Sequence, residues 1–194
     1  GYDFSFGKGR EGDCEFLLHA GKNNGFGLTA VGAIDDPDGQ AYSSTRIRTC
    51  LSNGDPRGAA ALLGRSFEIT GRVSHGDERG RTIGFPTANI HLDDYLEPLR
   101  GVYAVRAAIE TTDEPTWMDG VANLGIRPTF DKTEPVLEVF LFDFNGDLYD
   151  RHLRVQMIDF IRPEQKFDGL DALKNQIAAD CDQARAILAP KDKT

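Results

Sequence analysis

Val136-Leu-Glu-Val-Phe-Leu-Phe-Asp-Phe144 is followed directly by Asn145-Gly146 and then by a second apolar stretch, residues 148–161. Both stretches are rich in aromatic and β-branched side chains, which favour β-strands. An Asn-Gly pair between two such stretches is the strongest short-range signal for a tight hairpin. The sequence therefore predicts two strands that are joined, and paired, at Asn145-Gly146.

Three more strands are expected upstream, over residues 67–73, 102–109 and 117–122. Several short strands with turns between them and little helix are typical of a small β-barrel. A final helix follows, and Asp168 is its expected N-cap. We expect this helix to pack on the barrel and close one end through a single apolar stripe, made of Leu170, Leu173, Ile177, Cys181, Ala184 and Leu188.

Residues 1–64 have a different, α/β pattern. Asp13 is the expected cap of a helix that ends at Gly25, and a buried strand is expected over residues 26–34. A turn at residues 35–39 and two short helices follow, the second of them capped by Asp55 and ended by Gly64. The sequence therefore predicts a domain boundary after residue 64.

The composition excludes several classes of protein. The chain has 194 residues, a net charge of −9 and 40% hydrophobic residues, which is ordinary for a globular protein. It has no apolar run long enough to cross a bilayer and no basic footprint typical of nucleic-acid binding. Its three cysteines fit no zinc pattern and indicate reduced thiols in a cytoplasmic protein.

The stretch Gly76-Asp-Glu-Arg-Gly-Arg-Thr-Ile-Gly-Phe-Pro-Thr-Ala-Asn89 is the first candidate for chemistry. Its glycines and arginines suit a loop whose backbone N–H groups approach phosphate, although it lacks the Walker pattern. Thr87 and Asn89 lie two apart, so in a strand their oxygens share a face, and such oxygens suit Mg²⁺. The alternative is a glycine-rich hairpin with a capping asparagine.

Glu138 is the second candidate, because it is a carboxylate within an apolar strand. It shares a face with Val136, Phe140 and Phe142. Partial burial would make it a better general base. The alternative is a structural glutamate in a salt bridge.

Three further segments are weaker candidates for ligand-binding sites. Arg162 follows the last strand, where it can bind a carboxylate or phosphate or form a surface ion pair. Residues 123–130 form either a flap over a ligand or a simple connection. The stretch Ser43-Ser44-Thr45-Arg46-Ile47-Arg48 predicts either an anion site at a helix N-terminus or an ordinary cap with solvated arginines.

Taken together, these motifs resemble those of the bacterial bifunctional riboflavin kinase/FMN adenylyltransferases, also called FAD synthetases. Residues from about 66 to 188 resemble a complete riboflavin kinase module. Its most specific mark is Gly84-Phe-Pro-Thr-Ala-Asn89. The supporting marks are Asn123-Leu-Gly-Ile-Arg-Pro-Thr129, Leu137-Glu-Val-Phe-Leu141, Asp147-Leu-Tyr149 and Arg162-Pro-Glu-Gln-Lys-Phe167.

The resemblance implies a mainly β fold: a six-stranded Greek-key barrel with a C-terminal helix. It implies an ATP-dependent kinase that converts riboflavin into FMN, with Glu138 as the base and Thr87 and Asn89 as Mg²⁺ ligands. The implied ATP-binding residues are Gly76, Arg81, Gly84, Pro86, Thr87 and Asn89. The implied flavin-binding residues are Asn123, Arg127, Arg162 and Phe167.

Residues 1–64 resemble the end of the family's α/β, Rossmann-like adenylyltransferase domain. The family's upstream HxGH motif is absent from this chain. We therefore expect a partial domain with a vestigial nucleotidyl site at residues 43–46 and 48, FMN formation without FAD formation, and self-association through the unpaired N-terminal segment. The alternatives are a bifunctional enzyme that retains both activities and a non-catalytic flavin- or nucleotide-binding fragment.

Overall fold

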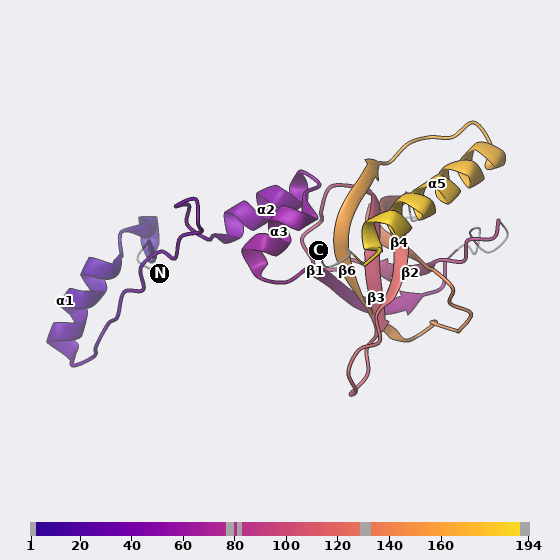
Figure 1. Cartoon of the computed structure of the whole chain (residues 1–194). Coiled ribbons are helices and arrows are strands. Elements are labelled where there is room, and N and C mark those ends of the chain that lie inside the picture. Colours follow the sequence, from indigo (N-terminus) through magenta and orange to yellow (C-terminus); the bar gives the residue numbers. More distant parts are fainter. Residues whose placement is uncertain (1–2, 77–79, 81–82, 129–132, 191–194) are drawn as a thin grey trace. The chain divides into compact units, whose positions relative to one another are not determined.

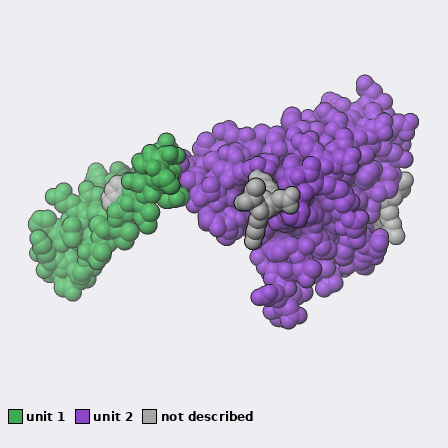
Figure 2. All heavy atoms as spheres, in the orientation of Figure 1, with its two compact units in different colours: residues 1–43 green, residues 44–194 purple. Residues whose placement is uncertain are grey.

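The computed structural model describes residues 3–76, 80, 83–128 and 133–190. The chain divides into two compact units, Gly1–Ser43 and Ser44–Thr194, which Figure 2 shows in different colours. The second unit holds two short helices, a barrel and a long C-terminal helix. The structural division therefore lies earlier than the predicted boundary after residue 64.

Six antiparallel strands form a closed barrel in the order β1-β2-β5-β4-β3-β6 (Figure 1). Because β2 pairs with β5 and not with β3, the chain crosses over between sequential strands, as in a Greek key. The predicted six-stranded barrel is confirmed. Its strands are β1 (Phe67–Ser74), β2 (Ala88–His91), β3 (Gly101–Ile109), β4 (Met118–Pro128), β5 (Thr133–Leu141) and β6 (His152–Pro163).

The hairpin predicted at Asn145-Gly146 is wrong. β5 pairs with β2 and β4, whereas β6 pairs with β1 and β3. Asp143 and Asp150, which lie after β5 and before β6, have φ values of 55° and 62° and turn the chain away from a direct hairpin. The Asn-Gly pair therefore lies in a longer connection, and closure of the barrel decides which strands pair.

The barrel interior is filled by side chains that alternate along each strand. Tyr103, Val105 and Ala107 of β3 are buried there, and the even-numbered residues between them face outward. The tyrosine hydroxyl donates a hydrogen bond to the carbonyl of Leu99, and burial raises the pKa of Tyr103. The other large interior side chains include Ile69, Ile90, Leu92, Leu124, Leu137, Leu153 and Met157.

Helices α2 (Ser44–Ser52) and α3 (Pro56–Leu63) pack against each other, and α3 contacts β1 and β6 of the barrel. The side chain of Asp55 caps α3 by accepting a hydrogen bond of 2.8 Å from the N–H of Gly58, as predicted. Arg57 of α3 forms a 2.6 Å ion pair with Asp159 of β6. The two helices are thereby attached to the strand that closes the barrel.

The first unit contains the 3-10 turn η1 (Lys8–Arg10) and helix α1 (Cys14–Asn24). Asp13 caps α1 and Gly25 ends it in the left-handed conformation, as predicted. The strand predicted over residues 26–34 is wrong. Residues 3–64 contain isolated bridges but no strand ladder, so the expected Rossmann-like sheet is not seen in them.

The physical reason is that a strand needs a continuous ladder of hydrogen bonds to a neighbouring strand, whereas residues 26–34 make only single backbone hydrogen bonds at their ends in the described part of the chain, from Phe26 to Gly21 and from Tyr42 to Ile34. Phe26 and Ile34 are consequently exposed and not buried as expected for a strand there. The turn predicted at residues 35–39 is confirmed by Asp36, whose side chain accepts hydrogen bonds from the N–H groups of Asp38 and Gln40.

Helix α5 (Leu170–Leu188) lies along the outer face of the barrel (Figure 1) and contacts β3, β4 and β6. It covers a side of the barrel and not an end, because the residues beneath it point outward from their strands. Cys181 and Ala184 pack against Val102 and Val121. Leu170, the first residue of the predicted stripe, is 64% exposed.

The capping prediction for α5 is wrong as well. Gly169, with φ 116°, occupies the N-cap position and no side chain caps the helix. Burial, together with the neighbouring Asp180 carboxylate, raises the pKa of the Cys181 thiol to about 11. Cys181 is therefore an unreactive packing residue.

One ionic group links β1 to β6. Glu68 accepts hydrogen bonds of 2.7 and 3.2 Å from Arg154 and one of 3.4 Å from Gln156. Burial by itself raises the pKa of Glu68, but the hydrogen bonds from Arg154 and Gln156 outweigh it, so the pKa lies below the ordinary value of 4.5.

We expect Glu68 to contribute to acid stability. A carboxyl whose pKa is lowered by folding stabilises the protein above its unfolded pKa, and this stabilisation is lost as the pH falls through the folded value. Glu68→Gln should cost about 1 kcal/mol at pH 7 and little below pH 4. Urea unfolding of the wild type and the variant at pH 7 and at a pH below 4 measures the difference in the free energy of unfolding. Asp150→Asn, which removes an exposed ion pair with Arg72, is the control. An equal cost at both pH values would contradict the assignment.

Candidate active site

Three residues singled out in the sequence lie side by side on adjacent strands. Asn89 of β2 is in register with Glu138 of β5, and Glu138 is in register with Asn123 of β4. Residues directly opposite one another in a sheet have Cβ atoms about 4.5–5.5 Å apart. Their neighbours along each strand fill the barrel interior, so the three polar side chains are on the outer face.

The same row extends over the remaining strands. Ser74 of β1 is in register with Asn89, and its hydroxyl donates a 3.3 Å hydrogen bond to the Asn89 carbonyl. Val102 of β3 is in register with Asn123, and Arg162 of β6 is in register with Val102. The barrel thus brings residues from four separate sequence motifs into one line with Val102 and with Ser74, which we did not predict.

Asn89 carries the clearest sign of a missing partner. It is 5% exposed, and its Oδ1 is buried without a hydrogen-bond partner among the described residues. A buried amide oxygen that is left unpaired is costly. Thr87, which is half-buried, lies just before β2 and adds a second oxygen nearby in the sequence. These hard oxygen donors fit a magnesium ion that also binds phosphate oxygens.

Glu138 lies where a polar and an apolar surface meet. It shares the outer face of β5 with Val136 and with Phe140 and Phe142, as predicted. Phe140 makes edge contacts with Phe85 and Phe142, at ring distances of 5.4 and 6.0 Å. The half-buried carboxylate therefore has aromatic rings on one side and the amides of the row on the other.

The glycine-rich segment forms a tight turn before β2. The carbonyl of Gly80 accepts hydrogen bonds of 3.2 and 2.8 Å from the N–H groups of Ile83 and Phe85. A Cβ at Gly80 would stand 3.5 Å from the Thr87 hydroxyl and would overlap with the Phe85 carbonyl. Gly84 has φ 92°, which only glycine adopts readily. Gly76 and Pro86 flank this turn, and Arg81 lies outside the described residues.

Arg162 is held by helix α5. Its Nε and Nη2 donate hydrogen bonds of 2.9 and 2.7 Å to the carboxylate of Asp180, which is 3% exposed. Gln176 donates a further 2.9 Å hydrogen bond to Asp180. The guanidinium also lies over the ring of Phe167 at 5.6 Å. In this structure, Arg162 therefore fixes α5 and the segment after β6 to the barrel.

Asp180 was not predicted from the sequence. Its only signal was an acidic residue directly beside the apolar stripe of a helix, which by itself does not indicate a partner. Arg127 lies in β4 opposite Glu134, and the structure does not describe its side chain.

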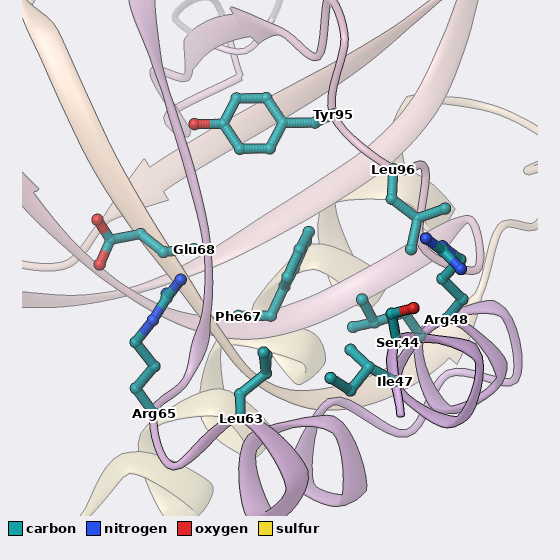
Figure 3. A pocket seen from close by; sticks show the side chains of 10 residues that line it. Ser44, Ile47, Arg48, Leu63, Arg65, Phe67, Glu68, Tyr95 and Leu96 are labelled. Carbon is teal, nitrogen blue, oxygen red and sulfur yellow. The ribbon is translucent and has the colours of Figure 1, made fainter. Parts of the chain in front are cut away.

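The predicted anion site on α2 is only partly assembled. Ser44 and Arg48 line a cavity of about 300 Å³ between α2, α3 and β1, whereas Ser43, Thr45 and Arg46 do not. Figure 3 shows Arg48 and Arg65 on opposite sides of this cavity, and Glu68 attracts Arg65. The two arginines therefore do not converge on one anion.

The described part of the chain also lacks two kinds of feature. No group of three or more His, Cys, Asp or Glu side chains there could hold a metal ion. No helix there is long and apolar enough to cross a membrane.

The sequence is similar to those of several known proteins. The family described as flavokinase, riboflavin kinase, matches residues 63–188. Bifunctional riboflavin kinase/FMN adenylyltransferases of Pseudomonas fluorescens and Bacillus subtilis are 47% and 42% identical, over 98% and 95% of this chain. The chain spans only 60% and 58% of their lengths.

A solved structure is similar as well. The crystal structure titled a macrolide-efflux protein from Streptococcus pneumoniae aligns with a TM-score of 0.74 and 38% identity, and covers 92% of this chain and 56% of that one. The family match includes all six strands, the row and α5. The chain therefore belongs to the riboflavin kinase family.

Proposed function

We propose that this chain transfers the γ-phosphate of ATP to the ribityl 5′-hydroxyl of riboflavin and releases FMN and ADP. The observation that carries the proposal is the row of Asn89, Glu138 and Asn123 on adjacent strands. It places a carboxylate beside an unpaired amide oxygen, and the family match covers both. Phosphoryl transfer needs chiefly positioning and charge stabilisation.

In the proposed reaction, Glu138 accepts the proton of the 5′-hydroxyl. The hydroxyl oxygen bonds to the γ-phosphorus while the bond from that phosphorus to the β–γ bridging oxygen breaks, and ADP keeps that electron pair. Thr87 and Asn89 hold the nucleotide with its Mg²⁺, which neutralises charge on the phosphate oxygens. The other ATP-binding residues in this proposal are Gly76, Arg81, Gly84 and Pro86.

The flavin side of the proposal consists of Asn123, Arg127, Arg162 and Phe167. The ion pair with Asp180 gives Arg162 an indirect role there, because its guanidinium holds Phe167 and the segment after β6 in place. The reduced cysteines Cys14, Cys50 and Cys181 agree with a cytoplasmic enzyme.

A bifunctional enzyme and a non-catalytic flavin-binding module are the alternatives. The longer relatives are named for both activities, which favours the first alternative for a longer protein. Incubation of the chain with riboflavin and Mg-ATP, followed by chromatographic separation of FMN and FAD, distinguishes all three. Flavin binding without either product would support the non-catalytic module.

Glu138→Gln tests the base. The amide keeps the size of the side chain but cannot accept the proton, so FMN turnover should fall by roughly 10²- to 10⁴-fold. Riboflavin binding, followed by fluorescence quenching, should be nearly unchanged. Glu110→Gln, beyond the end of β3, is the matched control and should retain activity. Turnover near that of the wild type would exclude Glu138 as the base.

Thr87→Val tests the metal and nucleotide site. The substitution removes one oxygen with little change in volume. The Mg²⁺ concentration needed for half-maximal FMN formation should rise, while riboflavin binding in the absence of nucleotide stays unchanged. Thr111→Val, at an exposed threonine, is the control. An unaltered Mg²⁺ requirement would contradict the assignment of Thr87.

The N-terminal residues 1–64 generate a prediction about FAD. They contain no HxGH motif, and transfer to an α-phosphate needs charge stabilisation from several sides. We expect FMN but no multiple-turnover FAD formation from the 194-residue chain. Size-exclusion chromatography of the same preparation measures the proposed self-association through residues 26–34. Sustained FAD formation would show that both activities are retained.

A further inference from the structure

Gly125 marks a space on the outer face of β4, two residues after Asn123 and opposite Val136 of β5. A Cβ at this position would overlap with Oε1 of Glu164 and would stand 3.1 Å from Nδ2 of Asn123. The Glu164 carboxylate and the Asn123 amide therefore converge on the space that glycine leaves open. Neither Glu164 nor Gly125 has a role in the function proposed above.

A second glycine allows Glu164 to reach this space. Glu164 directly follows Pro163 at the end of β6, and β3 separates β6 from β4. Gly101, at the start of β3, is in register with both Pro163 and Leu124 and has φ 148°. A Cβ there would stand 3.0 Å from Cα of Pro163. The close approach directs the chain after β6 across β3 toward β4.

Two carboxylates lie on different sides of Asn123. Glu138 lies opposite it on β5, and Glu164 approaches from the β6 side. A carboxylate only accepts hydrogen bonds, whereas the amide nitrogen only donates them. The Glu164 carboxylate also attracts Arg100. The pKa of Arg100 is raised chiefly by its hydrogen bond to Glu97, and in addition by the negative charges of Glu97 and Glu164. Glu164 is thus attracted by Arg100 and lies near the amide nitrogen of Asn123.

We propose that Glu164 is a positioning residue for riboflavin that acts through Asn123. Its carboxylate holds the amide nitrogen of Asn123 on the β6 side, so that the amide oxygen is presented to the hydroxyl groups of the ribityl chain beside Glu138. Gly125 is required because any side chain there would displace both groups. The inference rests on the proposed function and adds a specificity element for a polyol to the flavin side.

A double-mutant cycle tests the coupling. Glu164→Ala and Asn123→Ala should each raise the KM for riboflavin roughly 10-fold, with little change in kcat or in the KM for ATP, as expected for loss of a contact made by bound substrate. The double variant should be no worse than the more severe single variant, because both changes remove one interaction. A KM increase equal to the product of the two single effects would overturn the inference.

Two further variants separate positioning from folding. Gly125→Ala should reproduce the KM increase, and Gln165→Ala, on the same exposed segment, should leave KM unchanged. A thermal melt of each variant measures any loss of stability. The proposal is overturned if KM rises only in variants with a lowered Tm and Gln165→Ala is among them. Glu164 would then have a structural role.

Riboflavin binding by fluorescence quenching distinguishes this inference from the proposed function. If the wild-type chain binds no riboflavin, both proposals fail. If it binds riboflavin but makes no FMN, the kinase proposal fails, and weaker binding by Glu164→Ala still supports the positioning role. If it binds and turns over riboflavin, and Glu164→Ala has the same affinity and KM, only the positioning role is overturned.

Discussion

The pairing of β6 with both β1 and β3 is the constraint on which the rest of the structure depends. This pairing closes the sheet, so that no strand of the barrel keeps an open edge. Closure encloses an apolar interior that includes Tyr103 and Met157. It also determines the registers of all six strands, and one of those registers aligns Asn89, Glu138 and Asn123. The candidate site is thus a consequence of how the barrel closes.

Helix α5 divides the outer face of the barrel into two parts. Cys181 and Ala184 cover an apolar cluster, while the polar row with Glu138 lies beside it. The buried pair of Arg162 and Asp180 fixes this helix, and a buried pair is worth more for specifying one arrangement than for net stability. Glu164, two residues after Arg162, is directed to Gly125 by the same fixed segment. Packing and site geometry are therefore coupled on this face.

Local signals predicted local structure well. Asp13 and Asp55 cap α1 and α3 because an N-cap needs only a side-chain oxygen and the next turn of backbone. The alternation along β5 also placed Glu138 correctly on the face of Phe140 and Phe142. The strand expected over residues 26–34 and the hairpin at Asn145-Gly146 were wrong, because both depended on partners that a local pattern does not specify.

The sequence by itself determined five of the six barrel strands, the outward position of Glu138 and the membership in the riboflavin kinase family, since periodicity and motifs are properties of the chain. It did not predict β2. Only the tertiary structure decided that Asn89, Glu138 and Asn123 are neighbours, and that Arg162 faces Asp180. The reason is that β2, β4 and β5 are distant along the chain, and their registers follow from closure of the whole barrel and not from any single strand.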